Sequence, residues 1–207
     1  RNPYAPFTTS TLQQEASRKL GFSAKQTMQV AQRLYEGVDI GGETAGLITY
    51  MRTDGVTIIP EAVAAIRQLV EAEYSKRYLP PFIREYKAKA KNAQEAHEAI
   101  RPTEVTRRPQ DIRHHLGEDE AKLYLLVWQR AVASQMASAQ LERTSVDLVD
   151  GSGQLTLRAT GQVMRFPGFL ALYEEGRDDG SDDDARILPA MARGDVPAMT
   201  GVDADQH

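Results

Sequence analysis

Four segments of the chain repeat apolar residues with the spacing of helices that bury one face. Threonine and serine caps mark the start of the first helix, Pro60 opens the third, and glycines end the first two. The predicted helices cover residues 9–20, residues 23 or 25 to 37, residues 60–74 and residues 118–137. The last carries the widest apolar stripe, and we interpret its Trp128 and Met136 as core residues.

After residue 140 the period changes from helical to alternating. Strands predicted at residues 145–149 and 154–159 flank a turn, DGSG, and indicate an antiparallel hairpin. Residues 174–184 contain no apolar side chain, which predicts a mobile acidic loop. Further short strands are expected at residues 186–188 and 195–200. The fold class is therefore α+β, a mainly helical domain followed by a smaller antiparallel β segment.

Composition excludes several classes of protein. The longest apolar runs have five residues, far fewer than the roughly 18 that cross a bilayer, so no membrane span is expected. The absence of cysteine excludes a disulfide scaffold, a thiolate zinc site and a cysteine nucleophile, and is typical of a reducing, cytoplasmic compartment. The chain begins with Arg1 and carries no signal sequence, which we interpret as a piece of a longer protein.

Charge divides unevenly along the chain. Residues 1–115 contain 17 Lys and Arg against 13 Asp and Glu, whereas residues 116–207 contain 8 against 16. Only residues 1–115 have the net positive charge that favours binding of a polyanion. Its strongest basic run has three interleaved aromatic residues, as a surface that contacts phosphates and stacks bases requires, although a solvated charged loop explains the same pattern. The run comprises Lys76, Arg77, Arg84, Lys87, Lys89 and Lys91, with Tyr78, Phe82 and Tyr86.

A second candidate lies in the segment GLITYMRTDG, residues 46–55. In an extended backbone alternate side chains share a face, so Tyr50, Arg52 and Asp54 point one way. A tyrosine oxygen can attack a phosphodiester, and an arginine can bind the phosphate oxygens in bidentate fashion and stabilise the transition state. By spacing alone, a packing or surface role is the more common one for a tyrosine such as Tyr50.

A third candidate is the run QEAHEAIRP, residues 94–102. Interpreted as a helix, it places Gln94, His97 and Arg101 on one face and ends at Pro102. The two basic side chains then either stabilise the helix C-terminus or present N–H groups to a phosphate.

These segments together resemble bacterial DNA topoisomerase I, a type IA enzyme. The matching motifs are PFTTSTLQQEASRKLGFSAKQTMQVAQRLYEG, GLITYMRTDG, QEAHEAIRP and KLYLLVWQRAVASQM, which occur in order between residues 3 and 140. A weaker resemblance continues to about residue 200. The chain departs from the pattern in DIGGETAG before Tyr50 and in Gly55, where a serine is common.

The resemblance implies specific roles. Tyr50 resembles the tyrosine that attacks one strand and forms a 5′-phosphotyrosyl bond, and Arg52 the arginine beside the scissile phosphate. Both are candidate catalytic residues, while His97, Arg101, Lys87, Lys89 and Lys91 are candidate DNA contacts. The family further implies a winged-helix-like tyrosine domain, residues 1–138, and part of a β-rich arch, residues 139–207, which includes the mobile loop 174–184.

The resemblance also implies what the chain works with. The partner is DNA in single-stranded segments of negatively supercoiled duplex, in the bacterial cytoplasm and nucleoid. Mg²⁺ is the cofactor of the intact enzyme, held by an acidic domain before this chain, so we assign no metal ligand here. The acidic pairs Asp182/Asp184 and Asp203/Asp205 are interpreted as solvated loop. The isolated piece is expected to be inactive.

Two other functions stay open on the sequence. One is a non-catalytic winged-helix DNA-binding module in which Tyr50 is only packed. The other is a helical interaction domain whose acidic tail meets a basic partner protein.

Overall fold

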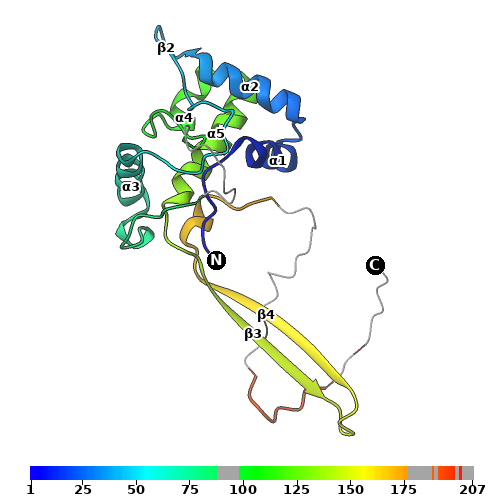
Figure 1. The fold of residues 1–207 in the computed structure, drawn as a ribbon. Coiled ribbons are helices and arrows are strands. Elements are labelled where there is room, and N and C mark those ends of the chain that lie inside the picture. Colours follow the sequence, from blue (N-terminus) through cyan, green and yellow to red (C-terminus); the bar gives the residue numbers. More distant parts are fainter. Residues whose placement is uncertain (88–97, 177–187, 189–190, 199–200, 202–207) are drawn as a thin grey trace. The chain divides into compact units, whose positions relative to one another are not determined.

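The structure is a computed structural model that describes residues 1–87, 98–176, 188, 191–198 and 201. The chain divides into two compact units (Figure 1). The helical unit comprises residues 1–140 and 164–180, and the hairpin unit comprises residues 141–163 and 181–207. The architecture confirms the predicted α+β class.

The helices of the helical unit have clear local causes. The side chain of Thr8 accepts a hydrogen bond from the Thr11 N–H at the start of α1, and Gly21 ends that helix in the left-handed conformation. Ser23 caps α2 in the same way, and a proline opens α3. The elements are α1 (Thr9–Leu20), α2 (Ala24–Glu36), α3 (Pro60–Tyr74), η1 (Lys76–Tyr78), α4 (Pro109–Ile112), η2 (Arg113–His115), α5 (Glu118–Ser134) and η3 (Gly168–Ala171).

Helix α5 forms the centre of the core. Helices α1, α2, α3 and α4 all pack against it, and Leu123, Tyr124, Val127 and Val132 are completely buried. Each fully buried side chain of this size contributes about 1.5–3 kcal/mol of hydrophobic stabilisation. The prediction of a core helix with a buried Trp128 and Met136 is therefore confirmed.

Helix α5 ends earlier than predicted, at Ser134 rather than at residue 137. The Ala137 N–H donates to the Tyr78 carbonyl at 2.7 Å, and this bond to η1 draws the chain away from the helix axis. The helical pattern continues in the sequence, but a tertiary contact overrides it.

The described part of the segment 94–102 is extended and not helical. Ile100 forms an antiparallel bridge with Phe7, and Pro102 forms one with Ile48. The helix predicted there is wrong for residues 98–102. Proline disfavours a helical residue before it, and the buried Ile100 satisfies its backbone by pairing with the N-terminal segment.

The hairpin unit confirms the predicted hairpin. Strands β3 (Gln140–Val149) and β4 (Thr156–Phe166) are longer than expected, and the carboxylate of Asp150 organises the turn by accepting the Leu155 N–H at 2.9 Å. Residues 195–198 form no strand, so that prediction is wrong for them. A small unpredicted ladder, β1 (Val38–Asp39) with β2 (Thr44–Ala45), lies in the helical unit.

No helix in the described ranges is long and apolar enough to cross a membrane.

Candidate active site

Residues 46–57 form a loop, here called the Tyr50 loop, whose inner side chains anchor it to the core. Leu47, Ile48 and Met51 are at most 1% exposed, whereas the Tyr50 ring is 37% exposed. Arg52 and Asp54 are exposed as well, and Thr53 is buried. The loop contains bends and is not a regular strand, but from Tyr50 to Asp54 its side chains alternate between solvent and core as an extended backbone predicts.

Hydrogen bonds hold the Tyr50 loop to three neighbouring segments. Backbone hydrogen bonds join the loop to Leu34 in α2. Others join it to Ala99, Arg101 and Thr103 in the extended segment 98–103. The Thr49 N–H donates to the Arg101 carbonyl at 2.9 Å, and its hydroxyl donates to the Ala99 carbonyl at 2.7 Å. The backbone on either side of Tyr50 is therefore fixed before any substrate binds.

The first turn of α1 supplies the third support. The Thr9 hydroxyl donates to the Met51 carbonyl at 2.7 Å and accepts the Thr53 N–H at 2.8 Å. The Thr9 N–H donates to the Thr53 carbonyl at 2.9 Å. A single side chain thus bridges both backbone neighbours of Arg52 and directs residues 50 and 52 away from the core.

Tyr35, at the end of α2, contacts the Tyr50 ring edge-on, with the ring centroids 5.3 Å apart and an interplanar angle of 67°. Gly46 lets the backbone of the Tyr50 loop lie close to the end of α2, because a Cβ at this position would lie 2.6 Å from the Tyr35 carbonyl oxygen. Sequence spacing predicts no role for Tyr35, since nothing local relates residues 35 and 50.

Arg101 is turned into the protein. Its side chain is 8% exposed and pairs with both oxygens of the Glu98 carboxylate, at 2.8 and 2.9 Å. It also donates to the carbonyls of Pro102 and Thr103. These contacts of Arg101 stabilise the conformation of segment 98–103, and this segment is hydrogen-bonded to Thr49. The predicted contact of Arg101 with DNA stays a prediction.

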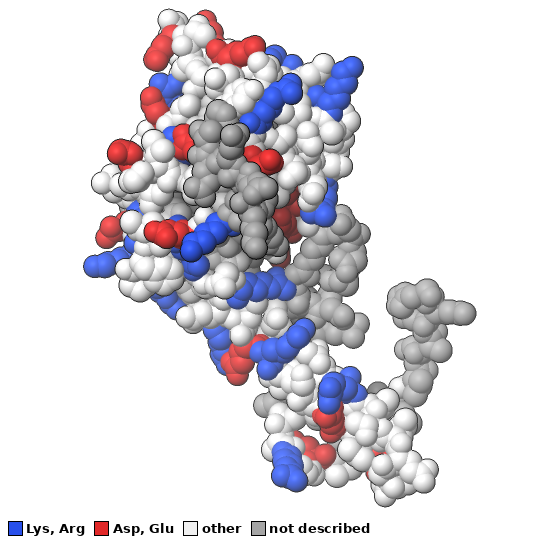
Figure 2. All heavy atoms as spheres, viewed as in Figure 1, with Lys and Arg blue, Asp and Glu red and all other residues white. Residues whose placement is uncertain are grey.

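The other predicted DNA contacts are only partly visible. His97, Lys89 and Lys91 lie outside the described residues, and Lys87 is exposed. In the same basic run, Arg84 donates to the Met136 carbonyl and the Ser138 hydroxyl. On the face of the helical unit seen in Figure 2, basic and acidic side chains are interspersed.

The aromatic residues of the basic run differ in how far they are buried by contacts with the rest of the protein. The hydroxyl of Tyr86 donates to the Ser134 carbonyl at 2.8 Å, and burial raises the pKa of Tyr86 to about 12. Tyr78 packs on Phe166 with centroids 4.9 Å apart. Phe82 is 58% exposed. Two of the three rings therefore serve the core, and only Phe82 is as exposed as the stacking interpretation requires.

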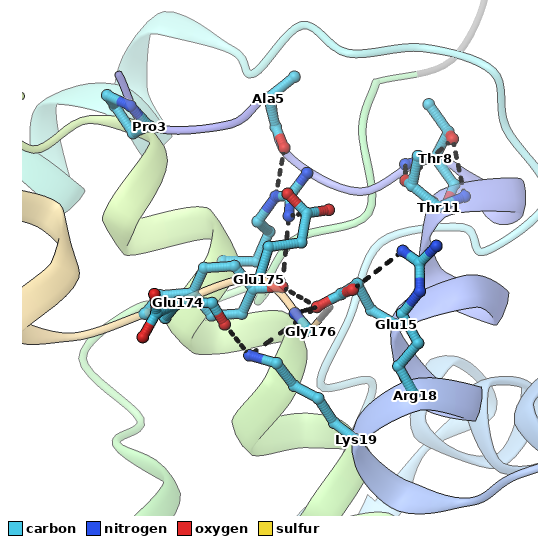
Figure 3. A network of polar contacts seen from close by, with 12 residues as sticks. Pro3, Ala5, Thr8, Thr11, Glu15, Arg18, Lys19, Glu174, Glu175 and Gly176 are labelled. Atoms are coloured by element: carbon cyan, nitrogen blue, oxygen red, sulfur yellow. Dashed lines mark hydrogen bonds and ion pairs between the residues drawn. The ribbon is translucent and has the colours of Figure 1, made fainter. Parts of the chain in front are cut away.

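A buried ionic network that the sequence patterns did not predict surrounds Glu15 (Figure 3). Glu15 on α1 has no solvent exposure and accepts hydrogen bonds from the Tyr173 hydroxyl at 2.7 Å and the Gly176 N–H at 3.1 Å. Arg18 and Lys19 lie beside it. Burial lowers the pKa of Lys19, and burial together with the hydrogen bond to Glu15 raises the pKa of Tyr173.

Arg130 on α5 forms the other half of this network. It is 4% exposed, donates to the Ala5 carbonyl at 2.6 Å and pairs with Glu175 at 3.1 Å. The rings of Tyr4, Phe7 and Tyr173 lie within 5.3 Å of its guanidinium carbon. Residues 174–176, expected to begin a mobile loop, are thus held by buried charges. The rest of that stretch lies outside the described residues.

One sequence signal could have indicated Glu15. Leu12, Glu15 and Ala16 share one face of α1 because they are three and four positions apart. An acidic residue on the apolar face of a helix requires a buried partner.

The described residues contain no group of three or more His, Asp or Glu side chains placed to bind a metal ion.

Comparison with known proteins identifies the family. The family model described as DNA topoisomerase matches residues 1–207. DNA topoisomerase 1 of Zymomonas mobilis is 55% identical over the whole chain, which covers 16% of that protein. DNA topoisomerase 1 of Rickettsia felis is 48% identical, again over the whole chain, which covers 27% of it.

A solved structure agrees with these relatives. Full-length topoisomerase I from Thermotoga maritima is 36% identical, with a TM-score of 0.73, over 89% of this chain and 30% of that one. The chain thus spans only a minor part of the length of each of these proteins. Its match to the family model from end to end shows that it belongs to the bacterial type IA DNA topoisomerase family.

Proposed function

We propose that this chain carries the strand-cleaving tyrosine of a type IA DNA topoisomerase, and that Tyr50 is that tyrosine. The Tyr50 loop carries the proposal, because its backbone is hydrogen-bonded on both sides while the Tyr50 ring is 37% exposed. A nucleophile on a fixed backbone reaches its target with little loss of orientational freedom. Arg52, exposed two residues further along, supports the same role.

In the proposed reaction the phenolic oxygen of Tyr50 attacks the phosphorus of one DNA phosphodiester. A bond forms between this oxygen and the 5′-phosphate, and the bond from phosphorus to the 3′ oxygen breaks. The phenolic proton passes overall to the released 3′-hydroxyl, so atoms and charge balance. Arg52 binds the phosphate oxygens through its paired N–H groups and stabilises their charge in the transition state.

Rejoining is the reverse attack, by the 3′-hydroxyl on the phosphotyrosine. The phosphotyrosyl bond conserves the energy of the phosphodiester, so the cycle requires no ATP. Between cleavage and rejoining the other strand passes through the break, which relaxes negatively supercoiled DNA. Because the chain covers 16–27% of the length of the two relatives named above, we propose that it does not turn over by itself and that further segments, with Mg²⁺, complete the site.

Trapping of the covalent intermediate tests the role of Tyr50. A topoisomerase of the relatives' full length that carries this chain is incubated with a 3′-labelled single-stranded oligonucleotide and Mg²⁺, and then denatured, so that the labelled fragment is the one joined to the tyrosine. We expect the unaltered protein to retain DNA covalently and Tyr50→Phe to retain none, a loss of at least 1,000-fold, because phenylalanine lacks the attacking oxygen.

Tyr35→Phe is the matched control. It removes a hydroxyl from the ring that contacts Tyr50 but keeps the edge-on packing, so we expect the adduct to persist. An adduct that survives Tyr50→Phe assigns the nucleophile to another residue. If the unaltered protein binds DNA without forming an adduct, the non-catalytic DNA-binding function replaces the proposal.

A further inference from the structure

The Tyr50 loop is hydrogen-bonded to the end of α2, where Tyr35 lies. The Leu47 N–H donates to the Leu34 carbonyl at 2.7 Å, and both leucine side chains are completely buried. Gly46 approaches α2 so closely that a Cβ there would lie 2.6 Å from the Tyr35 carbonyl oxygen. The backbone segments that carry the two tyrosines are therefore fixed relative to each other.

A fixed backbone still leaves the direction of the Tyr50 ring open. A side chain has three staggered conformations about χ1, and an exposed side chain changes between them within nanoseconds. The Tyr50 ring is 37% exposed. Cleavage requires a conformation that directs the phenolic oxygen at the phosphorus, so the rate depends on the fraction of molecules in that conformation.

The Tyr35 ring makes a contact that favours one conformation of Tyr50. The two rings meet edge-on, with their centroids 5.3 Å apart and an interplanar angle of 67°. Aromatic pairs prefer this geometry because the positive edge of one ring faces the negative face of the other, and the contact changes an equilibrium by about two- to tenfold. Tyr35 is itself 40% exposed, so its ring packs on Tyr50 without being part of the core.

We propose that Tyr35 is a positioning residue, whose ring holds the Tyr50 side chain in the conformation that attacks DNA. This rests on the proposed function, since it requires Tyr50 to be the nucleophile. The aromatic ring of Tyr35 has this role and its hydroxyl has none. Tyr35 therefore increases the rate of cleavage and leaves the affinity for DNA unchanged.

Two substitutions separate the ring of Tyr35 from its hydroxyl. Tyr35→Leu removes the ring but keeps an apolar residue that favours a helix, whereas Tyr35→Phe keeps the ring. In the full-length protein, saturated with single-stranded oligonucleotide, we expect Tyr35→Leu to form the covalent adduct about fivefold more slowly in a single turnover. Tyr35→Phe should retain the rate of the unaltered protein.

Two controls show whether the effect is specific to the cleavage step. Affinity for the oligonucleotide is measured by fluorescence anisotropy in the Tyr50→Phe background, where cleavage does not compete, and should be the same with each residue at position 35. Tyr74→Leu removes a comparable ring contact at the end of another helix, because Tyr74 ends α3 and packs on Tyr78 with centroids 5.6 Å apart. We expect its adduct to form at the unaltered rate.

NMR measures the conformation of the Tyr50 ring directly. Three-bond couplings from the backbone nitrogen and carbonyl carbon to Cγ report the χ1 populations of Tyr50 in the ¹³C,¹⁵N-labelled 207-residue chain. We expect the unaltered chain and Tyr35→Phe to show the couplings of one dominant conformation, and Tyr35→Leu to show averaged couplings. A purely structural role of Tyr35 would not change these couplings.

Several results would overturn the proposal. An unchanged cleavage rate or unchanged couplings in Tyr35→Leu would do so. A loss of affinity with an unchanged rate at saturation would make the Tyr35 ring a DNA contact instead, and a Tyr35→Phe variant as slow as Tyr35→Leu would assign the effect to the hydroxyl. If the adduct forms through Tyr50 but Tyr35→Leu changes nothing, only the positioning role is wrong. If Tyr50 forms no adduct in the unaltered protein, the proposed function fails and the positioning role fails with it.

Discussion

Glu15 and Arg130 are ionisable side chains that folding removes almost entirely from water. Isolated buried charges are costly, so each requires an opposite charge or several hydrogen bonds. Glu15 receives them from α1 itself and from residues 173 and 176, and Arg130 receives them from residues 5, 173 and 175. The network therefore joins chain segments more than 120 residues apart, at sites that are specific to one arrangement of the fold.

Replacement of Arg130 should reveal the strength of this network. Arg130→Met keeps most of the packing against the three rings but leaves Glu175 without its buried partner, and we expect the free energy of unfolding to fall by about 3 kcal/mol. Arg158→Met is the control, because its ion pair with Asp147 at 2.6 Å is exposed and should not measurably affect stability. Urea denaturation measures the free energy of unfolding of both variants and of the unaltered protein. Equal stabilities would show that Arg130 contributes no more than a surface pair.

At the scale of elements, the conformation of the Tyr50 loop depends on contacts with neighbouring segments. It has no regular secondary structure, and α1, α2 and segment 98–103 hold its backbone. A loop held in this way has its conformation determined before ligand binds, which favours catalysis by orientation. Thr9 contributes two of these bonds through a single hydroxyl.

Thr9→Val should separate the hydroxyl from the shape of the side chain. Valine is nearly isosteric but leaves the Thr53 N–H without its acceptor, so we expect a loss of about 1–2 kcal/mol in unfolding free energy. We also expect roughly tenfold slower adduct formation in the full-length protein. Thr9→Ser restores the hydroxyl and should recover most of that rate. Ser10→Ala, next to it, should behave as the unaltered protein, and an undiminished rate for Thr9→Val would exclude a positioning role.

At the scale of the whole molecule, the chain has two compact units, and its positive and negative charges are unevenly distributed along the sequence. Residues 1–115 carry a net positive charge and the remainder a net negative one, so we expect any phosphate contacts in the helical unit. The basic groups there have unequal availability: Arg84 and Arg101 donate to protein carbonyls or carboxylates, whereas Arg52 and Lys87 are exposed. Binding of a strand should therefore involve few phosphate contacts.

The salt dependence of DNA binding measures the number of phosphate contacts. For a single-stranded oligonucleotide and the 207-residue chain, the logarithm of the binding constant should fall linearly with the logarithm of salt concentration, by about 0.7 per phosphate neutralised. Arg52→Ala should reduce this slope by about 0.7, and Arg158→Ala, in the hairpin unit, should leave it unchanged. Binding that does not respond to salt would contradict a phosphate-dominated mode. Fluorescence anisotropy at several salt concentrations gives the slopes.

Sequence alone determined those features whose causes are local. Helices α1 and α3 begin and end at the predicted residues because caps, a proline and apolar spacing act within a few positions. The hairpin and the alternation of Tyr50 and Arg52 with Met51 follow from a two-residue period in the same way. The family followed from several motifs in order, which the family match confirms.

Tertiary structure decided what depends on partners distant in the chain. The early end of α5, the extended segment 98–102 and the inward turn of Arg101 each depend on a hydrogen bond or ion pair that local propensity does not contain. So do the contact of Tyr35 with Tyr50 and the buried pairing around Glu15. The physical reason is that the free energy of a buried polar group is set by the atoms around it, and these atoms meet only when the chain folds.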